Sequence, residues 1–234
     1  MGRRAKLRAV GVAVGLTIAA FVASVLAVLA ALVVIGVLVL LGSDPFDPPV
    51  VPLLVAGQLG FLLTGYLYAR RYGLAVPFGP PDRRDTGYVI GGTLAALAFA
   101  TVAAVGLETA GLVPESPLEA FPTDDPTLAI WLAMLSVVLV APTEEYLFRA
   151  VIQGRLRGSF GAQAALPLAS LLFGSLHLGN VVGSPATVLA WTLLITGVGV
   201  ILGLLYERTG TLVVPVAVHA LYDAVLFLTG YLTL

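Results

Sequence analysis

The alternation of apolar and polar residues divides the chain into seven long apolar stretches joined by short polar links. A helix that spans a bilayer needs about 20 consecutive, mainly apolar residues. By this criterion, spans are expected at roughly 10–41, 50–69, 87–110, 127–147, 162–179, 186–206 and 211–232. The sequence therefore predicts an all-α fold, a polytopic transmembrane helical bundle of about seven (six to eight) spans. Residues 1–234 are interpreted as a single integral-membrane domain.

The first apolar stretch and two of the links have special features. The stretch at 10–41 is too long for one upright helix, so we expect it to tilt or to project from the bilayer. It also far exceeds the apolar region of about 7–15 residues in a signal peptide, which favours a membrane helix. Links 44–49 and 114–126 are rich in proline and acidic residues and predict breaks between spans.

The distribution of charge predicts how the spans are oriented. All twelve Lys and Arg residues lie in the N-terminal segment or in every second link, whereas the other three links contain no Lys or Arg, and two of them contain acidic residues. Basic residues concentrate on the cytoplasmic side of membrane proteins. The sequence therefore predicts a multi-pass protein of the cell membrane with a cytoplasmic N-terminus and an external C-terminus.

The composition excludes several classes of function. The chain is 59% hydrophobic and 11% charged, whereas a soluble domain is about 25% charged. No room is left for a sizeable soluble domain, and the expected surroundings are the lipid bilayer, with no nucleic acid as a partner. The absence of cysteine excludes disulfides, thiol nucleophiles and Cys-based zinc sites. The oligomeric state is not indicated.

A pair of glutamates lies at the end of the apolar run 128–140. Glu144 and Glu145 are followed by Arg149, which lies four residues after Glu145 and hence on the same helical face. Ionisable groups in a membrane span cost about 2.5–3.5 kcal/mol each on insertion scales and therefore indicate function. We expect Arg149 to bind Glu145 through two hydrogen bonds. Glu144 then remains free to act on another group, and Pro142 could kink the helix beside it.

Both histidines of the chain also lie in apolar stretches. Phe173 and His177 share one face of the fifth predicted span, where Gly174 allows a neighbouring helix to approach closely. His219 and Asp223 share one face of the seventh span. A histidine and a carboxylate at this spacing can bind a metal together, or the carboxylate can fix the tautomer of the imidazole.

Each of these residues has a structural explanation when taken alone. The glutamates could lie at the membrane interface with Arg149 as an anchor, each histidine could be a hydrogen-bond partner between helices, and Asp223 could pair with a helix end. Taken together, these explanations would make both histidines and nearly every acidic residue outside the links incidental. The combined pattern favours a catalytic site.

The three motifs, Glu144-Glu145-x-x-x-Arg149, Phe173-x-x-x-His177 and His219-x-x-x-Asp223, occur in this order in late spans. This pattern resembles the CAAX prenyl endopeptidase and bacteriocin-processing (CPBP, or ABI) family of intramembrane metalloproteases. The resemblance covers a protease core at about 127–232, whereas the first three spans match only in hydropathy. It implies an intramembrane endopeptidase that cuts membrane-associated peptides or proteins, such as prenylated CAAX-type substrates or propeptides.

The resemblance also implies roles for the individual residues. Glu144 would be the general base that activates water with the help of His177, and Glu145 and Arg149 would support them. His219 and Asp223 would stabilise the oxyanion or hold a divalent metal. Relatives often have Asn where this chain has Asp223, and an ionised Asp cannot donate to an oxyanion. This difference favours a metal, with zinc held by Glu144, His177, His219 and Asp223.

A shared site requires residues on different spans to reach the same depth. On the predicted spans, Glu144 lies near one end of its helix and His177 near the opposite end of its own. We therefore expect tilted or offset helices, a fourth helix that continues to about Arg157, and a buried link at 179–185. Glu144, His177 and His219 are then expected within about 10 Å of one another.

Two other functions are left open by the sequence. Buried Glu, His and Asp also form proton relays, so a proton-coupled transporter is one alternative. Against it, the first half of the chain has no matching set of ionisable residues, as an internal repeat would require. The other alternative is a non-catalytic immunity or scaffold protein with the same fold, although none of the motif residues is missing.

Overall fold

The computed structural model describes residues 2–43, 50–79, 81–115 and 127–232. Within these ranges the chain is helical and has no strand, apart from one isolated bridge between Glu115 and Val182. The first half contains helices α1 (Arg3–Leu40), α2 (Val50–Tyr72) and α3 (Arg83–Thr109). The predicted break at 44–49, and most of the one at 114–126, lie outside the described residues.

The second half of the chain begins with a long helix of five consecutive segments. These are α4 (Thr127–Leu135), the π-helix η2 (Ser136–Val140), α5 (Ala141–Glu145), the π-helix η3 (Tyr146–Gln153) and α6 (Gly154–Phe160). The remaining elements are α7 (Ala162–Ser175), the 3₁₀ turn η4 (Leu176–Gly179), α8 (Pro185–Thr209) and α9 (Val213–Leu232).

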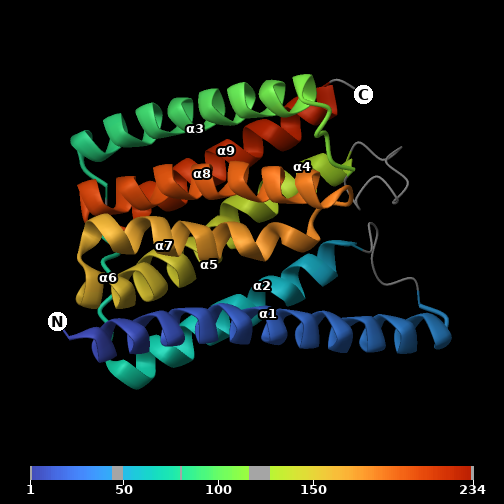
Figure 1. Cartoon of the computed structure of the whole chain (residues 1–234). Helices are drawn as coiled ribbons and strands as arrows, with labels where there is room; N and C mark the ends of the chain where they lie inside the picture. Colours follow the sequence, from blue (N-terminus) through green and yellow to red (C-terminus); the bar gives the residue numbers. More distant parts are fainter. Residues whose placement is uncertain (1, 44–49, 80, 116–126, 233–234) are drawn as a thin grey trace.

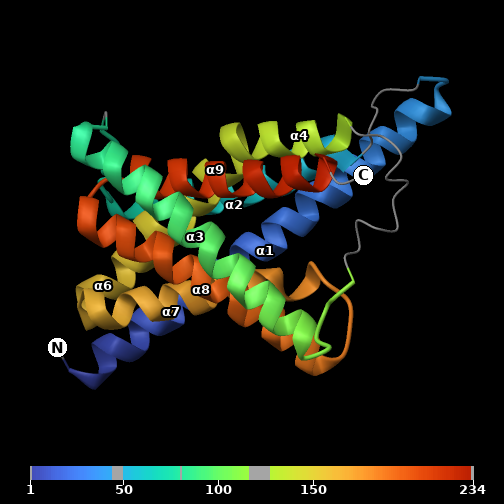
Figure 2. The same cartoon turned by 90° about the horizontal axis from the view of Figure 1, so that it is seen from above.

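The described helices have the lengths and composition of a multi-pass membrane protein. Six are long and apolar enough to cross a membrane, and a seventh, shorter apolar helix covers Val213–Thr229. The helices run back and forth beside one another (Figure 1). α1 projects beyond the other helices at its C-terminal end in both views (Figures 1 and 2), as its length predicts. The prediction of an all-α transmembrane bundle is confirmed.

The helix ends that carry basic residues lie at one end of the bundle (Figure 1). Lys6 at the start of α1 lies over the ring of Phe160 at the end of α6. Arg157 pairs with Glu207 near the end of α8, at 3.2 Å between Nε and Oε2. Arg149 is the exception, because it is fully buried inside the bundle rather than in a link.

Two expectations about the fourth and fifth spans have different outcomes. The helix that carries the glutamates continues beyond Arg157 to Phe160, as predicted, and this places Glu144 near its middle. The expectation of a buried link at 179–185 is wrong, because the link is exposed except for Val181. Its exposure is possible because η4 and α8 leave a short connection at the end of the bundle, away from the helix interfaces.

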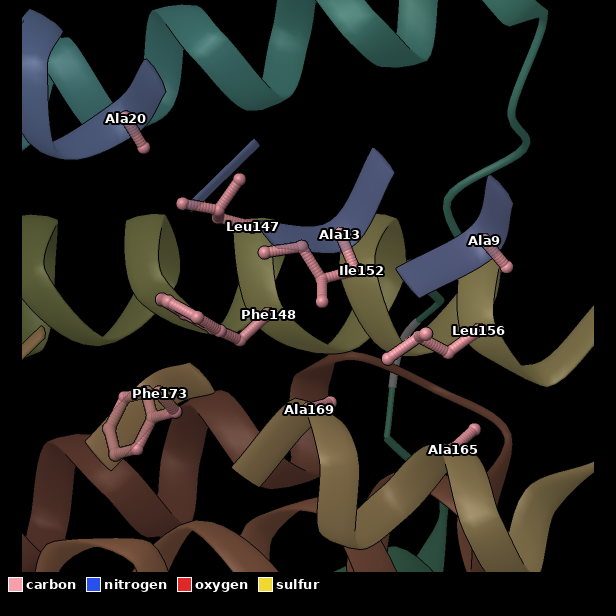
Figure 3. Close-up of a cluster of buried hydrophobic side chains, with 10 residues drawn as sticks. All are labelled: Ala9, Ala13, Ala20, Leu147, Phe148, Ile152, Leu156, Ala165, Ala169 and Phe173. Carbon is pink, nitrogen blue, oxygen red and sulfur yellow. The ribbon is translucent and has the colours of Figure 1, made fainter. Parts of the chain in front are cut away.

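Two hydrophobic clusters hold the helices together, and the first of them includes the glutamate-bearing helix. The first joins α1, η3, α6 and α7, and its buried residues are drawn in Figure 3: Ala9, Ala13, Ala20, Leu147, Phe148, Ile152, Leu156, Ala165, Ala169 and Phe173. The second joins α3, α8 and α9. Alanines dominate the α1 side of the first cluster, so that α1 can approach closely.

Two glycines fix the path of α7. Gly161 is the only residue between α6 and α7 and has a φ of 75°, a left-handed conformation that glycine adopts without strain. Gly174 lies against α8, where a Cβ atom would collide with Thr196 and with the carbonyl oxygen of Thr192. The close helix approach predicted for Gly174 is therefore present, and it sets the position of His177 in the next turn.

Candidate active site

The two glutamates lie between the two π-helical stretches of the long helix. Pro142 lacks an N–H group and cannot bond to the preceding turn, so the helix must widen or kink there. The chain widens, forming η2 immediately before α5 and η3 immediately after it. Single π turns within helices are frequent at functional sites. They change the directions of Glu144 and Glu145 from those that an undistorted helix would give.

Glu145 is the centre of a buried charged cluster. Its Oε2 accepts from Arg149 Nε at 2.8 Å, and both side chains are fully buried. This confirms the predicted pair, although only one of the two expected hydrogen bonds forms. Its Oε1 lies 3.0 Å from Nδ1 of His219, which is also buried. Both oxygens of Glu145 are thus engaged, and Arg149 compensates its charge away from water.

His219 lies between two carboxylates. Its Nε2 is 3.4 Å from Asp223 Oδ2, and this oxygen also accepts a hydrogen bond from Ser136 at 2.5 Å. Carboxylates only accept hydrogen bonds when ionised, so the ring can serve both partners only with a hydrogen on each nitrogen. The cluster joins the long helix to α9 and fixes the imidazole plane.

Glu144 faces a different neighbourhood. It lines a cavity of about 240 Å³ together with His177, Gln58 and Asn180. Its Oε1 accepts a hydrogen bond from Gln58 Nε2 at 3.1 Å. The remaining lining residues are mostly apolar and come from α1, α2 and η4: Ser24, Val28, Leu53, Leu54, Gly57, Phe61 and Leu176. The cavity therefore combines a carboxylate and an imidazole with apolar walls.

The tautomer of His177 follows from its hydrogen bond. Nδ1 lies 3.0 Å from the carbonyl oxygen of Phe173, which can only accept, so Nδ1 carries the hydrogen. In the neutral ring, Nε2 then has the free electron pair and can take a proton. The Phe173 ring contacts both imidazoles, with centroid distances of 5.0 Å to His177 and 5.9 Å to His219. One phenyl ring thus links the cavity to the charged cluster.

One family model matches the part of the chain that carries the three motifs. Residues 126–225 match the family model of type II CAAX prenyl endopeptidase Rce1-like proteins. This segment is Rce1-like. The resemblance inferred from the three motifs is confirmed over this segment, which contains all six predicted site residues.

The similarity to individual proteins is partial. The chain is 37% identical over 90 residues to the uncharacterized protein YpbD of Bacillus subtilis (strain 168). That alignment covers 38% of this chain and 40% of YpbD, so the chain spans well under half of this relative. No solved structure matches the chain. α1, α2 and α3 lie outside the Rce1-like segment, although the first two contribute to the cavity.

The four predicted metal ligands do not form one donor set in this arrangement. Glu144 and His177 line the cavity, whereas His219 and Asp223 belong to the charged cluster. In the described part of the chain, no three His, Asp or Glu side chains are grouped so that they could hold a metal ion. With carboxylates at both nitrogens, His219 has no electron pair for a metal. The residues of the Rce1-like segment therefore do not fit a single four-ligand zinc centre.

Three site residues were not predicted from the sequence. Gln58 and Asn180 line the cavity, and Ser136 binds Asp223. Gln58 carried a usable signal, because an amide in an otherwise apolar span is typical of a hydrogen bond between helices. Ser136 and Asn180 carried none, since their positions depend on the π-helical stretch and on the turn after α7.

Proposed function

We propose that the protein is an intramembrane peptidase in which Glu144 and His177 activate water for hydrolysis of a peptide bond. The observation that carries this proposal is that both side chains line one cavity. A carboxylate and an imidazole with a free Nε2 are groups that can take a proton from water. The match of residues 126–225 to the Rce1-like family supports the same class of reaction.

The proton transfers can be assigned to named groups. Glu144 takes one proton from the water. His177 Nε2 accepts a hydrogen bond from the other hydrogen of the same water. The water oxygen attacks the peptide carbonyl carbon, and a tetrahedral oxyanion forms. When the C–N bond breaks, Glu144 returns its proton to the leaving nitrogen.

The charged cluster supplies the oxyanion donor in this proposal. The 3.4 Å separation of His219 Nε2 from Asp223 exceeds the range of about 2.7–3.2 Å for a good N–H···O hydrogen bond. In this proposal, the N–H turns from Asp223 to the developing oxyanion of a substrate whose peptide carbonyl extends from the cavity past the Phe173 ring, which contacts both imidazoles. Glu145 fixes the ring through Nδ1, and Arg149 offsets the charge of Glu145.

The surroundings of the site and the positions of the basic residues support a class of substrate and an orientation in the membrane. The apolar cavity walls and the family description favour a membrane-associated peptide or protein, either a prenylated CAAX-type chain or a propeptide. The basic end of the bundle faces the cytoplasm, which makes the N-terminus cytoplasmic and the C-terminus external. Anionic lipid head groups then bind the basic end.

The proposal is tested with purified protein in liposomes that contain membrane-tethered peptides, including a farnesylated CAAX-type peptide. Products are identified by mass spectrometry. We expect cleavage at one bond by the wild type and a loss of about 10²–10⁴-fold in rate in His177→Ala, because the cavity loses its imidazole. A folded wild type that cleaves none of the peptides, or an equally active His177→Ala, contradicts the proposal.

Zinc remains a prediction of the sequence and is tested by metal content. If zinc takes part, we propose Glu144 and His177 in the cavity as its ligands rather than His219, whose two nitrogens lie beside carboxylates. About one zinc per chain, lost in His177→Ala and retained in His219→Ala, would place it there. Loss in both variants would require a rearrangement that brings His219 to the cavity.

A further inference from the structure

Gln58 touches the proposed base from a helix outside the Rce1-like segment. It lies near the middle of α2, in an otherwise apolar run, and is only 9% exposed. Its Nε2 donates to Glu144 Oε1 at 3.1 Å, and among the described residues no other side chain bonds to Glu144. Glu145, in contrast, is held at both oxygens. The direction of the Glu144 carboxylate therefore depends on Gln58.

The orientation of the Gln58 amide is fixed by chemistry. An ionised carboxylate only accepts hydrogen bonds, so the NH₂ group must face Glu144 and the carbonyl oxygen must point elsewhere. This Oε1 atom is buried and has no hydrogen-bond partner among the described residues. A buried polar atom without a partner is uncommon and needs an explanation. Here Gln58 lines the cavity, so Oε1 can accept from water that enters with a substrate.

The position of α2 is set by two close contacts that follow Gln58 along the helix. A Cβ atom on Gly60 would lie 2.5 Å from the backbone nitrogen of Ser24 in α1. A Cβ atom on Gly65 would lie 2.9 Å from the ring of Tyr146 in the long helix. α2 is thus packed tightly against both neighbours, and the reach of Gln58 to Glu144 does not depend on a flexible segment.

We propose that Gln58 is a positioning residue for peptide hydrolysis, holding Oε1 of Glu144 so that Oε2 is presented to the water beside His177. This inference rests on the proposed function. It gives α2 a role in the reaction, although none of the three motifs lies in α2. Because the hydrogen bond orients the base and does not bind the substrate, its loss lowers kcat and leaves KM nearly unchanged.

The test compares Gln58→Met with Gln153→Met in the liposome cleavage assay. Gln153 is a matched control, because it is also a buried glutamine whose Oε1 lacks a described partner. It bonds to Glu207 and Gly203, away from the cavity residues. We expect Gln58→Met to lower kcat about 10- to 100-fold with KM within about twofold of the wild type. Gln153→Met should keep the wild-type kcat per folded molecule.

Two further variants separate the possible outcomes. Gln58→Asn keeps an amide, but the side chain is too short to reach Glu144, so the kcat of this variant should also fall. It replaces Gln58→Met in the test if Gln58→Met does not fold. Wild-type kcat in a folded Gln58 variant, or a change in KM alone, overturns the proposal. If either of these results is found while Glu144→Gln is inactive in the same assay, only the role of Gln58 is overturned and the proposed function stands. A wild type without cleavage activity overturns both.

Discussion

Glu144→Gln should be inactive, with kcat reduced by at least about 10²–10⁴-fold relative to the wild type. The substitution preserves the size of the side chain but removes the group that takes the proton from water. Glu144 is largely buried in the cavity, and among the described residues no second carboxylate lines it. The measurement is the rate of peptide cleavage in liposomes at saturating substrate, with substrate binding measured separately.

The control for this prediction is Glu108→Gln. Glu108 lies near the end of α3, is exposed and is not among the residues that line the cavity. Glu108→Gln makes the same change from carboxylate to amide, but at an exposed position that does not line the cavity. The kcat of this variant should therefore stay within about twofold of the wild type. Activity of Glu144→Gln comparable to that of the Glu108 control would show that Glu144 is not the base.

Arg149→Met should reduce the free energy of unfolding by about 3–5 kcal/mol, because it leaves the buried carboxylate of Glu145 without its cation. Both members of the pair are fully buried. The variant also loses the contact of the guanidinium with the Phe173 ring, 5.2 Å from its centroid. The measurement is unfolding by SDS in mixed micelles. The double variant Glu145→Gln with Arg149→Met should recover part of the loss.

Arg157→Met provides the comparison with a pair whose arginine is exposed. The side chain of Arg157 is 59% exposed and that of its partner Glu207 is 10% exposed. An ion pair that water reaches contributes about 0–1 kcal/mol, so this variant should lose much less stability than Arg149→Met. Equal destabilisation by the two arginine substitutions would mean that the burial of Arg149 has no energetic consequence, contrary to the account.

The approximate positions of the helices could be predicted from the sequence, because the thickness of the bilayer sets the number of apolar residues in a spanning helix. It was less informative about where the long helix ends. The apolar run stops near Glu145, yet helix continues to Phe160, since polar residues such as Gln153 and Arg155 are good helix formers. This extension explains why Glu144 lies in mid-helix rather than at a membrane edge.

Local spacing predicted contacts within one helix better than contacts between helices. The pair of Glu145 with Arg149 follows from residues four apart. The contact of Glu145 with His219, separated by 74 residues, depends on how the long helix packs against α9. The π-helical stretches around Glu144 redirect the side chains, and the motifs alone contain no information on this effect.

This packing also explains why the predicted site is divided. The motifs suggested one set of four metal ligands, but His219 is engaged at both nitrogens by Glu145 and Asp223. Gln58, from a span with no motif, contacts Glu144 instead. The interpretation of Asp223 as a residue that orients His219 agrees with its position beside Nε2 and its bond to Ser136.

The central claim, that Glu144 and His177 act on the same water, is tested most directly by a double-mutant cycle. The cleavage rates of the wild type, Glu144→Gln, His177→Ala and the double variant are compared in liposomes. Residues that act as a unit have non-additive effects. The account predicts that the double variant is within about twofold of the slower single variant. If the fold-losses in rate of the two single variants multiply in the double variant, the two side chains act independently, and this result would contradict the shared site.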